Sequence, residues 1–386
     1  MMTTTRVTAP SDLGEVDIEP FRFRAADEEL DDLRERLART RFAPPAPGDL
    51  WDYGVPESYL RSMVAAWQDF DWRAVEDRIN GHPNYLAEID GQPVHFIHVR
   101  AKAEGATPLL LAHTYPGSVL DYLDMIGPLT DPEAHGGQAT DAFDVVIPSM
   151  PGTGFSQPLN GAGWTIARAA AVYDTLMRGL GYHSYGVHGS DMGAMVAREL
   201  VLLEPAGFLG AHVLQLFSFP SGDPEEFANF GEKEHRALEH LQWFQSVGGY
   251  NGMNATRPQT IAAALTDSPV GQLAYNELFE NFGNGTSLVS RDKVLAQVTL
   301  SWLTRSAAAA ARYYFEEQRA GVEPTVSRGR IGVAVFSDDF QTIRSLAERD
   351  NTGITHWSEL PRGGHYAAQE VPAEVVADLR TYFADS

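Results

Sequence analysis

The sequence predicts an α/β protein, in which helices cover both faces of a mostly parallel sheet and a helical insertion interrupts the pattern. Two observations predict this fold class. From residue 109 onward, short apolar runs typical of buried strands alternate with stretches of helical periodicity. A helix-rich segment, residues 217–326, then separates two parts of the alternation. In such sheets the active site lies at the carboxyl ends of the parallel strands.

The chain before this alternation is predicted to form a helical extension and a hairpin. Leu30, Leu33 and Leu37 have helical spacing in a segment that ends at a group of prolines. Further on, Asp90-Gly91 is a turn signal between two strand patterns, residues 85–89 and 94–99.

The remaining elements follow in order along the chain. We expect strands at residues 109–113, 143–148, 185–189, 208–214, 331–336 and 354–360, and helices at 119–129, 165–180, 194–203 and 371–383. The expected division is an N-terminal segment packed on the core (15–105), a core in two parts (106–216 and 327–386) and a helical cap over the strand ends (217–326).

Composition excludes several classes of function. The 29 Lys and Arg against 52 Asp and Glu give a net charge of −23, which argues against nucleic acid or an anionic membrane as a partner. There is no cysteine, so disulfides and thiolate chemistry are excluded, and we expect a cytoplasmic protein. The first ten residues do not have the pattern of a signal peptide. Without a Walker A or HExxH motif, we expect no cofactor and no metal.

The motif that predicts chemistry is Gly189-Ser190-Asp191-Met192-Gly193, between an expected strand and an expected helix. This is the pattern of a nucleophile elbow, in which glycines permit a strained turn that presents the central side chain. An aspartate there can attack carbon and form an alkyl-enzyme ester, which suits epoxides and haloalkanes. The alternative interpretation is an aspartate that only caps the next helix.

Two further groups complete the expected site. His365 follows the last strand in a Gly-Gly turn and would be the base that activates water. Asp338 and Asp339 both follow the preceding strand, and either could orient this histidine. The backbone N–H groups of Met192 and Tyr115 are the candidates for an oxyanion hole.

These motifs resemble the microsomal-type epoxide hydrolase family, from about residue 19 to 383. The N-terminal residues 70–73, 78–80, 88–91 and 95–100 look like the signature of its N-terminal domain. Residues 113–118 are similar to HGWPGS, 148–156 to PSLPGYGFS, 189–193 to GGDWG, 363–367 to GGHFA, 256–260 to TRPQT and 266–271 to TDSPVG. The resemblance implies the α/β-hydrolase fold and the opening of an epoxide by water. It is nearest to the bacterial, actinomycete-like branch that includes enzymes of enediyne antibiotic pathways.

The resemblance also implies two cap tyrosines that hydrogen-bond the epoxide oxygen. Tyr250 matches the first, and the family spacing selects Tyr314 over Tyr313 for the second. A phenol is a neutral donor at pH 7, which suits this task.

Three departures from the family pattern stand out. Thr114 replaces a glycine in the oxyanion loop, and Met192 replaces the tryptophan after the nucleophile. The glutamate of mammalian members would fall at Thr342, whereas the bacterial and fungal pattern favours Asp339 over Asp338. Mammalian members also have an N-terminal membrane anchor, and we expect no membrane association here.

Two alternatives remain at this level. A haloalkane dehalogenase shares the aspartate and histidine, but Met192 cannot donate to a halide as tryptophan does. The second alternative is a binding protein of the same fold without catalytic activity. It stays open because Thr114 replaces the glycine of the oxyanion loop. The expected partners are a small epoxide and water, and the sequence leaves a homodimer open.

Overall fold

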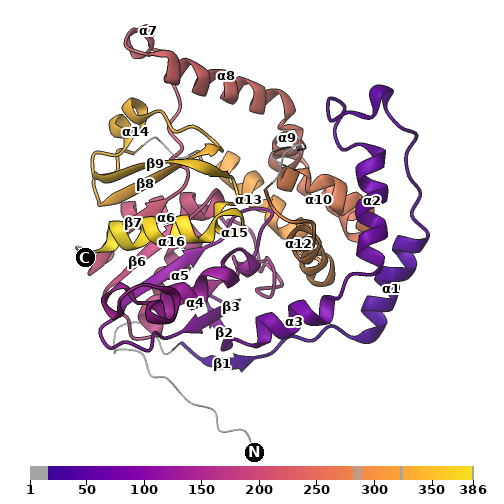
Figure 1. Ribbon diagram of the computed structural model, residues 1–386, viewed down its shortest axis with the longest axis horizontal. Coiled ribbons are helices and arrows are strands. Elements are labelled where there is room, and N and C mark those ends of the chain that lie inside the picture. Colours follow the sequence, from indigo (N-terminus) through magenta and orange to yellow (C-terminus); the bar gives the residue numbers. More distant parts are fainter. Residues whose placement is uncertain (1–15, 281, 283–284, 286–287, 322–324, 385–386) are drawn as a thin grey trace, which may run out of the picture.

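The computed structural model describes residues 16–280, 282, 285, 288–321 and 325–384 (Figure 1). The first ten residues, where we expect no signal peptide, lie outside the described residues. So do residue 15, at the start of the expected N-terminal segment, and a few positions of the expected cap.

The described residues form a nine-stranded sheet in the order β1-β2-β3-β5-β4-β6-β7-β8-β9. The first three strands and β5 pair in antiparallel fashion, and the pairs from β5 through β4, β6, β7 and β8 to β9 are parallel. The strands are β1 (Ile18–Phe21), β2 (Asn84–Ile89), β3 (Gln92–Val99), β4 (Thr107–Ala112), β5 (Phe143–Pro148), β6 (Tyr185–Gly189), β7 (Phe208–Val213), β8 (Ile331–Asp338) and β9 (Ile354–Gly364). The sequence pattern predicted all of these strands except the short edge strand β1.

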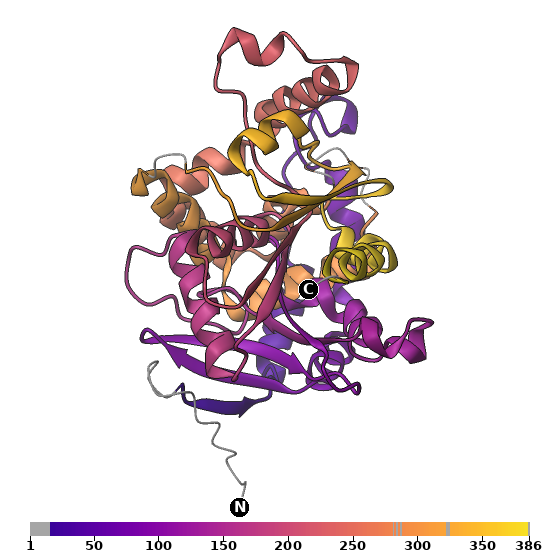
Figure 2. The ribbon, with the colours of Figure 1, turned by 90° about the vertical axis from the view of Figure 1, so that its left-hand side faces the viewer.

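Helices cover both faces of this sheet, as the alternation predicts. On one face α5 (Ile166–Gly179) packs against α6 (Met192–Leu203), and on the other α4 (Leu123–Thr130) packs against α16 (Pro372–Phe383). Figure 2, a view turned by 90°, shows α16 and the α5–α6 pair on opposite sides of the strands. Short helices α14 (Arg344–Asp350) and α15 (Ala367–Glu370) flank β9.

In the segment between β7 and β8, all regular elements among the described residues are helices. It contains α7 (Pro224–Phe227), α8 (Glu232–Val247), α9 (Gly249–Thr256), α10 (Pro258–Asp267), α11 (Pro269–Tyr275), α12 (Arg291–Thr304) and α13 (Ala307–Ala320). Helices α9, α10 and α13 pack on one another, whereas α8 projects at the upper edge of the molecule (Figure 1).

The N-terminal helices lie beside this segment. They are α1 (Asp27–Ala38), α2 (Glu57–Gln68) and α3 (Trp72–Asn80), and they contact α11 and α12. The predicted helical face of α1 is buried, since Leu30, Leu33 and Leu37 are each at most 5% exposed. Among the described helices, none is both long and apolar enough to cross a membrane.

Candidate active site

The turn between β6 and α6 holds Asp191 in a strained backbone conformation. Its φ is +52°, a value that costs a non-glycine residue on the order of 1–3 kcal/mol. The flanking glycines permit the close approach. A Cβ on Gly189 would lie 2.1 Å from the carbonyl oxygen of Gly193, and one on Gly193 would lie 2.0 Å from that of Ala112. The elbow therefore exists only because these two positions lack side chains.

The Asp191 carboxylate is directed to backbone donors. Its Oδ2 accepts the N–H of Tyr115, which follows β4, at 3.0 Å. The N–H of Met192, at the start of α6, also hydrogen-bonds the carboxylate. Burial raises the pKa of Asp191, while the positive charge of His365 and these two N–H groups oppose the rise. One carboxylate oxygen thus lies where negative charge is stabilised by fixed dipoles.

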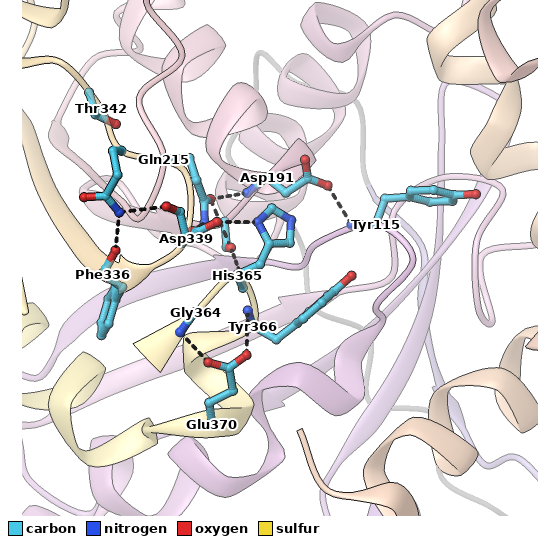
Figure 3. Close-up of polar contacts among 12 residues, drawn as sticks. Tyr115, Asp191, Gln215, Phe336, Asp339, Thr342, Gly364, His365, Tyr366 and Glu370 are labelled. Carbon is cyan, nitrogen blue, oxygen red and sulfur yellow. Dashed lines mark hydrogen bonds and ion pairs between the residues drawn. The ribbon is translucent and has the colours of Figure 1, made fainter. Parts of the chain in front are cut away.

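His365 and Asp339 form a buried pair below Asp191 (Figure 3). Nδ1 of His365 lies 2.9 Å from Oδ1 of Asp339, and both side chains are at most 6% exposed. Asp338 is exposed. Thr342 uses its hydroxyl to accept a backbone N–H at 3.3 Å. Burial would lower the pKa of His365, but the charge and hydrogen bond of Asp339, and then the charge of Asp191, raise it to about 9.

The loop with the unusual Thr114 is anchored by a buried carboxylate that sequence reasoning missed. Asp121 accepts the Thr114 hydroxyl at 2.8 Å and the Thr114 N–H at 3.2 Å. It also accepts the side-chain amides of Gln297 and Gln369. Burial raises the pKa of Asp121 to about 6 in spite of these hydrogen bonds. The threonine hydroxyl is therefore satisfied, and the N–H of Tyr115 remains directed at the elbow.

Tyr250 and Tyr314 meet above the elbow, although they come from different helices, α9 and α13. Their rings lie 6.1 Å apart at 84°, and their hydroxyls are hydrogen-bonded to each other. Burial and the charge of Asp191 raise the pKa of Tyr250, and burial, the charge of Tyr250 and that of Asp191 raise the pKa of Tyr314. Both phenols are therefore neutral donors in the resting site.

Tyr313, the neighbour of Tyr314, is turned differently. Its side chain is fully buried, and its hydroxyl donates to the carbonyl oxygen of Pro151 at 3.1 Å. The structure thus brings Tyr314 and Tyr250 together, and it ties the Tyr313 hydroxyl to the core.

A cavity of about 320 Å³ opens at this point, between the elbow and the helices that follow β7. Its walls are mostly apolar and aromatic, which suits a small hydrophobic ligand. The lining residues are Ile166, Asp191, Met192, Met195, Phe217, Phe219, Phe244, Tyr250, Asn251, Tyr313, Tyr314 and Glu317.

Two more polar residues of the site have no motif that would have revealed them. Gln215, just after β7, accepts the N–H of Asp191 at 2.6 Å. Glu370 accepts the N–H groups of Gly364 and Tyr366 and thereby ties down the loop that carries His365. Only the position of Gln215 after a buried strand, at the sheet edge where sites form, could have drawn attention to it.

The part of the chain that the structure describes contains one cluster of metal-ligand type, and it lies elsewhere. His212 on β7, His356 on β9 and Asp378 on α16 have ligand atoms within 4.8 Å of one another. These side chains already hydrogen-bond one another, at 2.7 Å from His212 and 3.0 Å from His356 to the carboxylate. The residues around Asp191 belong to no such described cluster.

The parallel sheet, the glycine-flanked elbow and the buried histidine–aspartate pair define an α/β-hydrolase. Residues 107–280 accordingly match the family model described as alpha/beta hydrolase fold, and residues 18–122 match that described as epoxide hydrolase N terminus. Epoxide hydrolase 1 of Oryctolagus cuniculus is 30% identical, over 96% of this chain and 89% of its own. A Stigmatella aurantiaca protein, provisionally named an epoxide hydrolase, is 40% identical over 95% of this chain and 84% of its own. The chain belongs to the epoxide hydrolase family.

Solved structures agree with this assignment. The Aspergillus niger epoxide hydrolase superposes with a TM-score of 0.83 and 27% identity, over 98% of each chain. The juvenile hormone epoxide hydrolase of Bombyx mori does so with a TM-score of 0.83 and 25% identity, over 98% of this chain and 97% of its own. The protein is thus an enzyme that hydrolyses epoxides.

Proposed function

We propose that Asp191 opens the epoxide as a nucleophile and that His365 then directs water to the resulting ester. The observation that carries this proposal is the position of Asp191 between two sets of donors. Tyr115 N–H holds its Oδ2 at 3.0 Å, and Tyr250 and Tyr314, whose hydroxyls meet, line the same cavity as Asp191. An epoxide between them would present its carbon to the carboxylate and its oxygen to the phenols.

In the first half-reaction, Oδ1 of Asp191 attacks an epoxide carbon and the bond between that carbon and the ring oxygen breaks. The ring oxygen takes the electron pair and receives a proton from a tyrosine hydroxyl, which is left as a phenolate. The product is a neutral alkyl ester of Asp191 that carries a hydroxyl on the adjacent carbon.

In the second half-reaction, His365 takes a proton from water, and the oxygen attacks the ester carbonyl carbon. Negative charge develops on Oδ2, where the N–H of Tyr115 already lies, and the N–H of Met192, which interacts with the same carboxylate, would be the second donor. Asp339 stabilises the imidazolium. The bond from the carboxyl carbon to Oδ1 then breaks, and the diol leaves with a proton returned from His365. The carboxylic acid that remains gives its proton to the phenolate, which regenerates both the carboxylate and the tyrosine.

Intact-protein mass spectrometry during reaction with styrene oxide tests these roles. His365→Gln should accumulate one covalent substrate mass, because the ester forms but no base activates water. Asp191→Asn should show neither adduct nor turnover. Asp339→Asn should lower kcat by up to about 10⁴, as for the aspartate of serine proteases, whereas the exposed Asp338 serves as the matched control. Turnover by freshly prepared Asp191→Asn enzyme would remove the nucleophile assignment.

Several finer expectations belong to the same proposal. We propose residues 15–105 as the N-terminal unit, 106–216 and 327–386 as the core, and 217–326 as the cap. The chemistry needs no cofactor or metal. Chloride release from 1-chlorobutane would favour a dehalogenase instead, and the paired tyrosines argue for the epoxide. A cytoplasmic location, a homodimer and a role in antibiotic biosynthesis remain predictions.

A further inference from the structure

Gln215 is a buried side chain whose amide hydrogen-bonds three residues of the site. It follows β7, is only 1% exposed, and lies between Asp191 and Asp339 (Figure 3). Its Oε1 accepts the N–H of Asp191 at 2.6 Å and the hydroxyl of Ser190 at 3.1 Å. Its Nε2 donates to Oδ2 of Asp339. The orientation of the amide is unambiguous, because one end meets an N–H and the other meets a carboxylate.

Two of these hydrogen bonds give a partner to a buried polar group that would otherwise have none. With φ at +52°, Asp191 turns its N–H away from the strand and helix hydrogen bonds, and this donor needs a buried acceptor. Asp339 uses Oδ1 for His365, so its buried charge needs a donor on Oδ2. Ser190 also donates to the carbonyl oxygen of His365 at 3.2 Å. One amide therefore links the elbow, the acid and the histidine loop.

We propose that Gln215 is a positioning residue of the epoxide-opening site, which fixes the elbow of Asp191 against the Asp339–His365 pair. This inference rests on the roles proposed above for those three residues. Gln215 is buried and is not among the residues that line the cavity, so it would act through Asp191 and Asp339 and not on the substrate.

The charges around Gln215 make a carboxylate at this position informative. Gln215 hydrogen-bonds Asp191 and Asp339 directly, and Asp339 in turn hydrogen-bonds His365. Glu370 and His240 interact with Asp339 electrostatically. A glutamate at position 215 is isosteric with glutamine. When protonated, it can accept from Asp191 and donate to Asp339 as the amide does. When ionised, it places a second carboxylate against Asp339 and has no proton to donate.

The test is the pH dependence of kcat for Gln215→Glu, expressed as a ratio to the wild type at each pH. We expect this ratio to fall as pH rises, by about tenfold per pH unit once the new carboxyl ionises. A role in packing alone would leave the ratio constant with pH, and that result would overturn the proposal.

Gln341→Glu is the matched control, because it introduces the same charge in the same region. The Gln341 amide donates to the backbone carbonyl oxygens of Phe336 and Asp339, at 2.7 Å each, and not to the Asp339 carboxylate. Its ratio to the wild type should change little with pH. An equal pH dependence in both variants would mean that a general field, not the Gln215 bridge, is responsible, and would also overturn the proposal.

Gln215→Leu gives a second measurement that does not depend on folding of the glutamate variant. It keeps the size and removes all three hydrogen bonds, so kcat should fall by about 100-fold with a smaller change in KM, as expected for a misplaced catalytic group. A wild-type kcat would overturn the proposal. The experiments distinguish a failure of the Gln215 proposal from a failure of the proposed roles of Asp191 and His365. If His365→Gln traps the adduct and Asp191→Asn does not, while the Gln215 variants behave as wild type, only the role of Gln215 is wrong.

Discussion

Asp191 and His365 influence each other's ionisation because both are enclosed in one small site. The negative charge of Asp191 is among the causes that raise the pKa of His365 to about 9. Alkylation converts this carboxylate to a neutral ester and removes that cause. We therefore expect the reaction itself to lower the pKa of His365, so that the base becomes available when the ester is present.

The prediction is that His365 titrates at a lower pH in Asp191→Asn, which mimics the neutral ester, than in the wild type near pH 9. NMR titration of the imidazole measures both values. Since the free imidazole is the base, single-turnover hydrolysis of the ester should increase with pH through a midpoint below that of the resting enzyme. Equal pKa values in the two proteins would show that Asp191 does not control the histidine.

Tyr250 and Tyr314 give a second prediction at this scale. Tyr250→Phe and Tyr314→Phe keep the rings and remove the donors, so each should slow alkylation by about 10²-fold, the lower range for a lost oxyanion donor. Tyr313→Phe is the control, because its hydroxyl donates to Pro151 and not to the partner phenol. Rapid-quench formation of the ester is the measurement. If Tyr313→Phe is the slow variant, the assignment is wrong by one residue.

At the scale of single elements, the junction of β6 and α6 depends on contact between backbones. Gly193→Ala would place its Cβ 2.0 Å from the carbonyl oxygen of Ala112 on β4. Because one of the two backbone segments would have to move to relieve this contact, we expect a loss of about 1–3 kcal/mol in the free energy of unfolding, together with reduced activity. Gly252→Ala on α9, where a Cβ meets nothing within 4 Å, is the control. Equal denaturation midpoints would contradict this account.

A row of histidines crosses the sheet and connects elements far apart in sequence. In the strand register, His188 pairs with His212, His212 with Gly332, and Gly332 with His356. Asp378 on α16 accepts from His212 and His356. These two hydrogen bonds connect the C-terminal helix to two strands, β7 and β9.

For the whole molecule, this row predicts a dependence of stability on pH. Burial would raise the pKa of Asp378, but the hydrogen bond and charge of His212 and the hydrogen bond of His356 lower it from 3.8 to about 2. A depressed carboxyl pKa stabilises the fold above pH 3.8 and ceases to do so as pH falls towards 2, by about 2 kcal/mol in total. Asp378→Asn should therefore destabilise the protein more at pH 5 than at pH 3, by about 1 kcal/mol in urea unfolding. The exposed Asp338→Asn should show no such difference.

The sequence predicted most of the sheet because its strands are short apolar runs between clear turns. It missed β1, a four-residue edge strand that contains Pro20. It could not separate Asp338 from Asp339 by alternation, because the register between β8 and β9 shifts after Phe336. The role of Gln215 could not be predicted from the sequence, because it depends on Asp191 and Asp339, which only the tertiary structure brings together.

The fixed orientation of the Asp191 carboxylate has a consequence for the origin of the product's oxygen atoms. With Oδ2 held by the Tyr115 N–H at 3.0 Å, only Oδ1 attacks, so the first diol leaves with an oxygen that belonged to the enzyme. Water replaces that single atom at every cycle. After many turnovers in heavy-oxygen water, peptide mass spectrometry should find one labelled oxygen in Asp191. Two labelled oxygens would mean that the carboxylate rotates between cycles, and that the oxyanion hole does not distinguish its two atoms.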